Sequence, residues 1–237
     1  LCEQYAVLGW WCATREDFVC CACHDRHDED EDLDDAGATC PTDGYYVSDK
    51  EAAEAAAKKV DKPSAETHML VKLAGEGRLV RHCVRGVQFF ADPMNDAVQG
   101  VGAHLWFAAR ALIDYVAPNG QGAVASGARV CELGAGCGGV GLALHTLSQC
   151  AVTLTDLPHI LPLLRFNAAH VACASPAREP ARVAPLRWGD DHDLAALSPE
   201  PFDVILGADI AYEPEQHLPL LLTMETLAAS SSSSSSA

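Results

Sequence analysis

The sequence predicts an α/β fold in which helices cover both faces of a doubly wound, parallel sheet. From residue 129 onward, short β-branched or apolar runs alternate four times with segments of helical periodicity. A glycine-rich turn joins the first of these strands to the helix that follows it. Units of this kind require right-handed crossovers, and such crossovers give a parallel sheet covered by helices. With 237 residues, 49% of them hydrophobic, the chain can form one substantial core.

The net charge argues against several classes of partner. The chain has 16 Lys and Arg residues against 33 Asp and Glu residues, which gives a formal charge of −17. Because phosphates and anionic membrane surfaces bind cationic faces, we expect neither a nucleic acid nor a membrane as partner. The longest stretch free of Asp, Glu, Lys and Arg, residues 133–155, contains five glycines and is too polar for a transmembrane helix.

The eleven cysteines are an odd number in a chain much longer than a small disulfide scaffold. We interpret them as reduced thiols and expect a monomeric intracellular protein, in the cytoplasm and with the nucleus as a further compartment.

Cys20, Cys23, His24 and His27 form a CxxCHxxH cluster of candidate zinc ligands. These pairs lie too close together to suit a tetrahedral site, so we expect no metal. Cys137 opens a helix, where a thiolate is favoured, but no His and Asp partners match it.

The acid excess lies mainly at the front of the chain. Residues 1–66 hold 17 acidic and 6 basic residues, and we expect an acidic, cysteine-rich, poorly ordered segment. Within it, residues 25–35 carry eight acids, and repulsion between them predicts a solvated loop. Residues 50–60 are rich in good helix formers, with Ser48 and Asp49 placed to cap them, and predict a surface helix. The boundary is expected near Glu66.

Residues 67–99 are expected to lead into the main domain. The run RLVRHCVRGVQFF, residues 78–90, is β-branched and aromatic at near-alternating positions and predicts a strand or hairpin. From Trp106 the apolar spacing becomes helical, and Pro118 with the following Asn-Gly ends this helix. Its predicted apolar face consists of Leu105, Ala108, Ala109, Leu112 and Val116.

The four strand and helix units fill residues 129–228. Their strands are predicted at residues 129–133, 151–155, 183–188 and 202–210, and their helices at 140–147, 160–171, 194–197 and 216–228. The fourth strand, FDVILGADI, is typical of a strand buried on both faces, which normally has neighbours on both sides. Only a serine-rich tail, residues 230–237, follows the last helix. We therefore expect a sheet truncated after strand four and prone to aggregation at that edge.

The first strand ends in the turn LGAGCGG, residues 133–139, which opens the next helix. Gly134, Gly136 and Gly139 fit the spacing G-x-G-x-x-G, which brings backbone amides close to a ligand. Asp156 ends the second strand, where a carboxylate can accept hydrogen bonds from two ribose hydroxyls. These residues predict an adenosine-containing cofactor of unspecified kind. The alternatives are a tight turn without ligand and, for Asp156, a helix cap before Pro158.

Five motifs carry a resemblance to a known family. They are GAHLWFAARALIDYV, VCELGAGCGGVGL, VTLTDLP followed by Asn167, LRWG, and FDVILGADIAY. Together they closely resemble the seven-strand S-adenosylmethionine-dependent methyltransferases of family 16, in particular the branch that methylates lysines of non-histone proteins. The resemblance covers residues 100–227 and leaves residues 1–75 outside. It implies a Rossmann-like class I methyltransferase fold with strand order 3-2-1-4-5-7-6, so residues 100–229 would lack strands five to seven.

The resemblance also implies a binding site for S-adenosylmethionine. The glycine turn would cradle the methionine end of the cofactor, the acid after the second strand would hold its ribose, and aromatic and small residues would line its adenine and methyl-bearing side. From the helix alone, Trp106 is better explained as a core aromatic residue, and only the motif match reverses this. The expected cofactor-binding residues are Trp106, Glu132, Gly134, Ala135, Gly136, Asp156, Trp188 and Ala208.

Asp209 and Tyr212 match the D-x-x-Y motif of this family and would lie where the acceptor lysine enters. A carboxylate can orient an ammonium, and an aromatic ring can hold the apolar stem of lysine or contact its cation. Since transfer of a sulfonium methyl group to an amine is a direct displacement, we assign both residues to positioning and claim no general base. Ala211 is smaller than the residue most common at its place in the motif. The alternative for Asp209 is a cap of the next helix.

The expected function is methyl transfer from S-adenosylmethionine to a lysine side chain of a protein, of the chaperone, ATPase or elongation-factor type. Two alternatives stay open. One is a catalytically inactive fragment or interaction module of the same fold. The other is a nicotinamide-dependent oxidoreductase, which Trp188, Ala208 and the D-x-x-Y residues disfavour.

Overall fold

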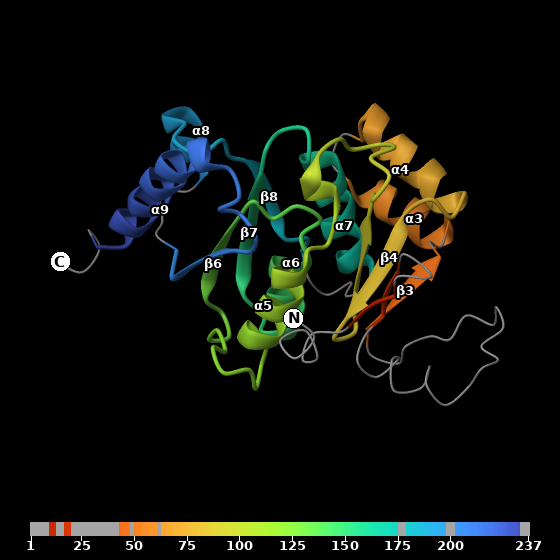
Figure 1. Cartoon of the computed structure of the whole chain (residues 1–237), viewed down its shortest axis with the longest axis horizontal. Helices are drawn as coiled ribbons and strands as arrows, with labels where there is room; N and C mark the ends of the chain where they lie inside the picture. Colours follow the sequence, from red (N-terminus) through yellow and green to blue (C-terminus); the bar gives the residue numbers. More distant parts are fainter. Residues whose placement is uncertain are drawn as a thin grey trace.

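The computed structural model describes residues 10–12, 17–19, 43–47, 50–60, 63–174, 179–197 and 202–232 (Figure 1). A four-stranded sheet of order β8-β7-β6-β9 lies at its centre. All three strand pairings are parallel, and Val130 of β6 lies opposite both Val152 of β7 and Val204 of β9. The predicted α/β class is confirmed, with strand order 3-2-1-4 along the chain. The strands are β6 (Arg129–Leu133), β7 (Ala151–Asp156), β8 (Arg182–Pro185) and β9 (Val204–Gly207).

Helices cover both faces of this sheet, as a doubly wound fold requires (Figure 1). Because successive side chains of a strand point to opposite faces, neighbouring residues of β6 reach different cores. Val130 belongs to the larger core, with α5, α6 and α7, whereas Cys131 belongs to the smaller core, with α8 and α9. The helices are α5 (Phe107–Val116), α6 (Gly139–Leu147), α7 (Leu161–Ala174), α8 (Asp191–Leu197) and α9 (His217–Ser232).

An antiparallel sheet of order β3-β4-β5 precedes the parallel sheet along the chain. The hairpin predicted for residues 78–90 is confirmed as β4 and β5. Its turn consists of Arg85 and Gly86, whose φ angles of 50° and 82° suit a two-residue hairpin. A separate antiparallel pair consists of β1 and β2. The bounds are β1 (Trp10–Cys12), β2 (Asp17–Val19), β3 (Asp43–Val47), β4 (Val80–Val84) and β5 (Val87–Ala91).

Two further helices, α3 (Lys50–Lys59) and α4 (Ala65–Gly75), pack against α7 and against each other. Ala53 and Ala56 of α3 are fully buried, because their small side chains allow a close approach of helices. The boundary expected near Glu66 therefore falls inside α4. The poorly ordered segment was expected to reach this boundary, but from α3 onward the chain packs on the main domain.

The side-chain amide of Asn167 joins three parts of the fold. Its Nδ2 donates to the carbonyl oxygens of Phe90 and Cys137, at 2.8 Å each, and its Oδ1 accepts from the amide of Phe90 at 2.8 Å. The residue is fully buried on α7. It therefore holds β5 and the glycine turn after β6 against the same helix.

The last two strands are shorter than predicted. β8 ends before Trp188, because Arg187 turns toward Asp193, whose carboxylate binds the amide and the guanidinium of Arg187. β9 ends before Ile210, because Asp209 adopts a left-handed φ of 55°. Side chains of β9 pack on both faces of the sheet, Val204 and Leu206 against the larger core and Ile205 against the smaller one. They are only half-buried, because within the described residues β9 pairs only with β6 and forms the edge that the sequence predicted.

Beside this edge, α9 leaves an apolar surface exposed, formed by Leu218, Leu221, Leu222 and Met224. The helix continues to Ser232, into the serine run.

The apolar face of α5 includes Ile113, which is fully buried and which the predicted face omitted. None of the described helices is both long enough and apolar enough to cross a membrane. The loop at residues 25–35, the caps Ser48 and Asp49, the CxxCHxxH cluster and residues 233–237 lie outside the described residues.

Replacing Asn167 with alanine should lower the free energy of unfolding by about 2 to 5 kcal/mol, since it leaves buried backbone groups of Phe90 and Cys137 without their partner. Urea-induced unfolding measures this change. The control is Lys72→Ala, at an exposed position of α4, where we expect a change of at most about 0.5 kcal/mol. Equal effects of the two substitutions would contradict the role given to Asn167.

Candidate active site

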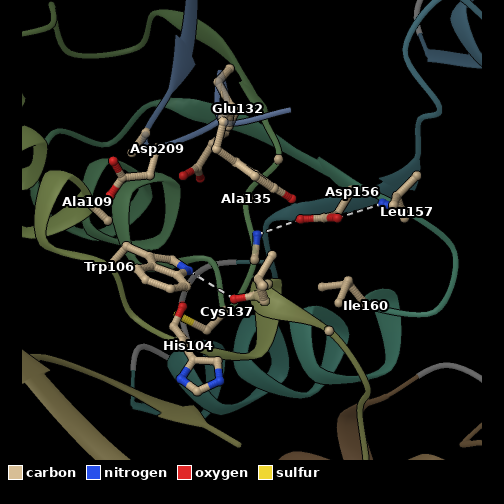
Figure 2. A pocket seen from close by; sticks show the side chains of 18 of the residues that line it. His104, Trp106, Ala109, Glu132, Ala135, Cys137, Asp156, Leu157, Ile160 and Asp209 are labelled. Carbon is tan, nitrogen blue, oxygen red and sulfur yellow. Dashed lines mark hydrogen bonds between the residues drawn. The ribbon is translucent and has the colours of Figure 1, made fainter. Parts of the chain in front are cut away.

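A cavity of about 610 Å³ lies beyond the carboxyl ends of strands β6, β7 and β9 (Figure 2). This is the edge at which parallel sheets of this kind bind ligands. The structure brings all ten residues predicted for the site into the wall of this one cavity, while the role of each stays a prediction. These residues are Trp106, Glu132, Gly134, Ala135, Gly136, Asp156, Trp188, Ala208, Asp209 and Tyr212.

The glycine turn forms the floor of the cavity because it has no side chains at two crowded positions. Gly134 and Gly136 have left-handed φ angles of 59° and 57°. A Cβ atom on Gly136 would lie 2.7 Å from the carbonyl oxygen of Gly102, and one on Gly134 would lie 2.8 Å from a methyl carbon of Ile210. Both the conformation and the space therefore require glycine, and the backbone stays close to any ligand.

Asp156 ends β7, as predicted, and its carboxylate binds the glycine turn. Oδ2 accepts from the amide of Gly136 at 2.7 Å, and Oδ1 accepts from the amide of Leu157 at 2.7 Å (Figure 2). Burial raises the pKa of the Asp156 carboxyl, while these two amides and nearby His159 oppose the shift. Within the described residues, its bonds go to the turn and not to the first turn of α7, so they do not support the alternative of a helix cap.

Trp106 stands in the cavity wall rather than in the core. It precedes α5, its side chain is 46% exposed, and its indole Nε1 donates to the carbonyl of Val101 at 2.9 Å (Figure 2). Its ring also contacts that of His104, with 5.8 Å between the ring centroids. The alternative of a plain core aromatic is therefore wrong.

Trp188 and Ala208 flank the cavity from turns that follow β8 and β9. Trp188 packs partly against the smaller core, although it does not end β8 as predicted. The turn that carries it is fixed by the neighbouring Arg187, whose guanidinium lies 2.8 and 2.9 Å from the two carboxylate oxygens of Asp193. This pair raises the pKa of the guanidinium and lowers that of the carboxyl.

Glu132 is the most deeply buried acid of the cavity. Its side chain comes from β6 and is 3% exposed, and Oε2 accepts from the amide of Gly141 at 2.8 Å. Burial raises the pKa of Glu132 to about 8, with a further contribution from the charge of Asp156 and an opposing one from the Gly141 amide.

Asp209 and Tyr212 follow β9 and reach the cavity from its outer side. Oδ2 of Asp209 accepts from the amide of Ala108, in the first turn of α5, at 3.3 Å. The alternative that Asp209 caps the next helix is therefore not supported, since the helix that it binds lies 101 residues earlier in the chain. Tyr212 is 60% exposed, and its pKa is raised by partial burial and by the carboxylates of Glu213 and Asp156.

Sequence reasoning missed part of the wall. The segment before Trp106, which includes η1 (Val101–Ala103) and His104, lines the cavity, as do His159 and Glu213. From Gly102 onward this segment belongs to the first motif. The motif match therefore pointed to the whole segment, but only Trp106 was predicted as a site residue. Cys137 also lines the cavity, but it is buried and its thiol pKa is raised to about 12, which fits the expectation that it is no nucleophile.

Gly136→Ala should lower the melting temperature more than Gly127→Ala. Both glycines have positive φ, so both substitutions strain the backbone by about 1 to 2 kcal/mol. Only at Gly136 does the added methyl group also meet a carbonyl oxygen, whereas Gly127 has open space around it. Thermal unfolding followed by circular dichroism compares the two, and equal losses would contradict the close approach of Gly102.

The sequence that forms the cavity matches known proteins. A family model described as lysine methyltransferase matches residues 92–235. EEF1A lysine methyltransferase 3 of Xenopus tropicalis is 38% identical over 128 residues, 54% of this chain and 53% of that protein. The Mus musculus protein of the same name is 42% identical over 123 residues, 52% of this chain and 49% of that protein. Protein N-lysine methyltransferase METTL21A of Mus musculus is 38% identical over 135 residues, 56% of this chain and 58% of that protein.

The chain thus spans about half the length of the curated relatives it matches. The family model covers more than half of the chain and contains every residue that lines the cavity. The fold, the position of the cavity and these matches agree, and the chain belongs to the lysine methyltransferase family.

Proposed function

We propose that this chain binds S-adenosylmethionine in the cavity and transfers its methyl group to the side-chain amine of a lysine in another protein. The lysine methyltransferases of this family take the methyl group from S-adenosylmethionine. The observation that carries the proposal is the convergence of three features on one cavity: the crowded glycine turn, the acid after β7, and the Asp and Tyr after β9.

The described residues fit this cofactor. Gly134 and Gly136 line the cavity with backbone alone, because Ile210 and Gly102 leave no room for a Cβ atom, and Asp156 offers a carboxylate next to them. Four acids line the cavity. The described lining residues include one Lys or Arg, Arg187, and its guanidinium forms an ion pair with Asp193, which does not line the cavity. An excess of acids suits a ligand that carries positive charge. When bound, the cofactor supplies a methyl group that is already activated on sulfur.

On this proposal Asp209 and Tyr212 position the acceptor. The lysine must react as a neutral amine, and with an ordinary pKa of about 10.4 its deprotonation at pH 7.4 requires about 4 kcal/mol. Partial desolvation at the mouth favours the neutral amine. The carboxylate of Asp209 can direct the incoming ammonium, and the exposed ring of Tyr212 can lie along the apolar stem of the lysine.

The names of the relatives support a protein substrate. EEF1A is named as the substrate of one of them, and the other is named as a protein N-lysine methyltransferase. We infer a substrate of the elongation-factor, chaperone or ATPase type, and an enzyme that acts as a monomer in the cytoplasm.

Methylation of a cell lysate with isotopically labelled cofactor, read by mass spectrometry, tests the proposed activity and substrate type. An inactive interaction module would bind cofactor or partner and label nothing, whereas binding of a nicotinamide cofactor instead would contradict the proposal.

Asp156→Ala should weaken S-adenosylmethionine binding about tenfold to a hundredfold, because the ribose would lose hydrogen bonds to a carboxylate, worth roughly 1.5 to 3 kcal/mol. Isothermal titration calorimetry measures the affinity. The matched control is Asp191→Ala, an exposed acid in the first turn of α8 that does not line the cavity, for which we expect unchanged affinity. Unchanged binding in a folded Asp156→Ala protein would contradict the assignment.

Asp209→Ala should strongly reduce lysine methylation and leave cofactor affinity within a few fold, because Asp209 is assigned to the acceptor. Asp209→Asn separates charge from structure, since the asparagine oxygen can still accept from the amide of Ala108. We expect both variants to lose methylation in the lysate assay. If Asp209→Asn keeps full activity, the residue acts only as a cap of α5, and if cofactor binding collapses, it belongs to the cofactor side.

A further inference from the structure

Glu132 is a buried carboxyl without a positive partner. It lines the cavity from the end of β6 with a side chain that is 3% exposed. Its one hydrogen bond comes from the amide of Gly141 on α6, at 2.8 Å, and within the described residues no Lys, Arg or His forms an ion pair with it. One neutral donor compensates only a small part of the desolvation of an ionised carboxylate.

The titratable groups around Glu132 do not supply the missing charge. Asp156 on β7 and Asp209 after β9 are acids, and the thiol of Cys137 in the glycine turn is buried and neutral. Arg187, after β8, is held by Asp193. His104 stands in the wall before α5, where its ring lies against Trp106, and His159, after β7, acts on Asp156. Neither histidine forms an ion pair with Glu132, and Glu213 adds another acid to the wall. Among the described residues, the cavity therefore surrounds Glu132 mainly with other acids and neutral groups.

A carboxyl in such a place favours its neutral form, because burial penalises the charge and a nearby carboxylate repels it. The raised pKa of Glu132, about 8, agrees with this geometry. At neutral pH the protonated, uncharged form of Glu132 therefore predominates in the protein without ligand.

We propose that binding of the positively charged cofactor expels this proton, so that Glu132 becomes the carboxylate partner of the cofactor's cation. The inference rests on the proposed function, since it places S-adenosylmethionine in the cavity. The O–H bond of the carboxyl breaks, the proton passes to the solvent buffer, and the charge left on Glu132 faces the charge of the ligand. No other bond forms or breaks.

The sign of the resulting pH dependence follows directly. The ligand selects the ionised form of Glu132, and below pH 8 most free molecules must first lose a proton to reach that form. The affinity should therefore rise up to tenfold for each unit between pH 6 and pH 7, rise more slowly toward pH 8, and level off above it. A ligand of the same shape without positive charge should show no such increase.

The test is calorimetric titration of the chain at pH 7 in two buffers of different ionisation enthalpy, which gives the number of protons released per ligand bound. For S-adenosylmethionine we expect a larger proton release, approaching one proton, from the native chain than from Glu132→Gln, and a pH dependence of affinity that this variant lacks. Subtracting the variant removes the titration of the ligand itself. The neutral analogue 5′-methylthioadenosine provides a second comparison that needs no variant, and should release no proton from the native chain.

The outcomes separate the two proposals. Binding of S-adenosylmethionine with equal proton release from the native chain and Glu132→Gln would overturn the coupling and leave the proposed function intact. Equal proton release by the neutral analogue would do the same. Failure of the native chain to bind S-adenosylmethionine in any buffer would overturn the proposed function and the coupling with it.

Discussion

The cavity depends on the buried amide of Asn167. This side chain uses both its donor and its acceptor capacity on backbone groups of Phe90 in β5 and of Cys137 in the glycine turn after β6. Because the site is fully buried, water cannot replace these bonds. The glycine turn, whose left-handed residues would otherwise have many conformations, is thereby held from behind by a helix. Its open backbone can then face a ligand without a large loss of chain entropy on binding.

The acids of the cavity are held by backbone amides rather than by cations. Asp156 binds the amides of Gly136 and Leu157, Glu132 that of Gly141, and Asp209 that of Ala108. Amides fix the position of a carboxyl group but supply no full positive charge to pair with it. The opposite charge can then come from the ligand, and on the proposed function both ligands are cations: the cofactor and the acceptor lysine. Among the described residues that line the cavity, the one guanidinium, that of Arg187, is paired with Asp193.

The sequence was sufficient for features that depend on local pattern. The bounds of β6 agree with the prediction, and the ten expected site residues share one cavity, because the carboxyl ends of parallel strands meet at one edge. Features set by distant contacts could not be predicted. The bond from Ala108 to Asp209, the packing of α3 on α7 and the turn of Arg187 toward Asp193 have no signal in a periodic pattern. The ends of β8 and β9 were misplaced because the turns at Arg187 and Asp209, rather than the apolar pattern, end these strands.

The bond between Asp209 and Ala108 joins two parts of the cavity wall. Asp209 and Trp106 both line the cavity, and Ala108 follows Trp106 by two residues, so one carboxylate connects the turn after β9 with the start of α5. Oδ2 is used by α5, which leaves Oδ1 for an incoming ammonium. On the proposed function, the residue that orients the lysine is thus held by the same helix whose N-cap, Trp106, lines the cofactor's cavity.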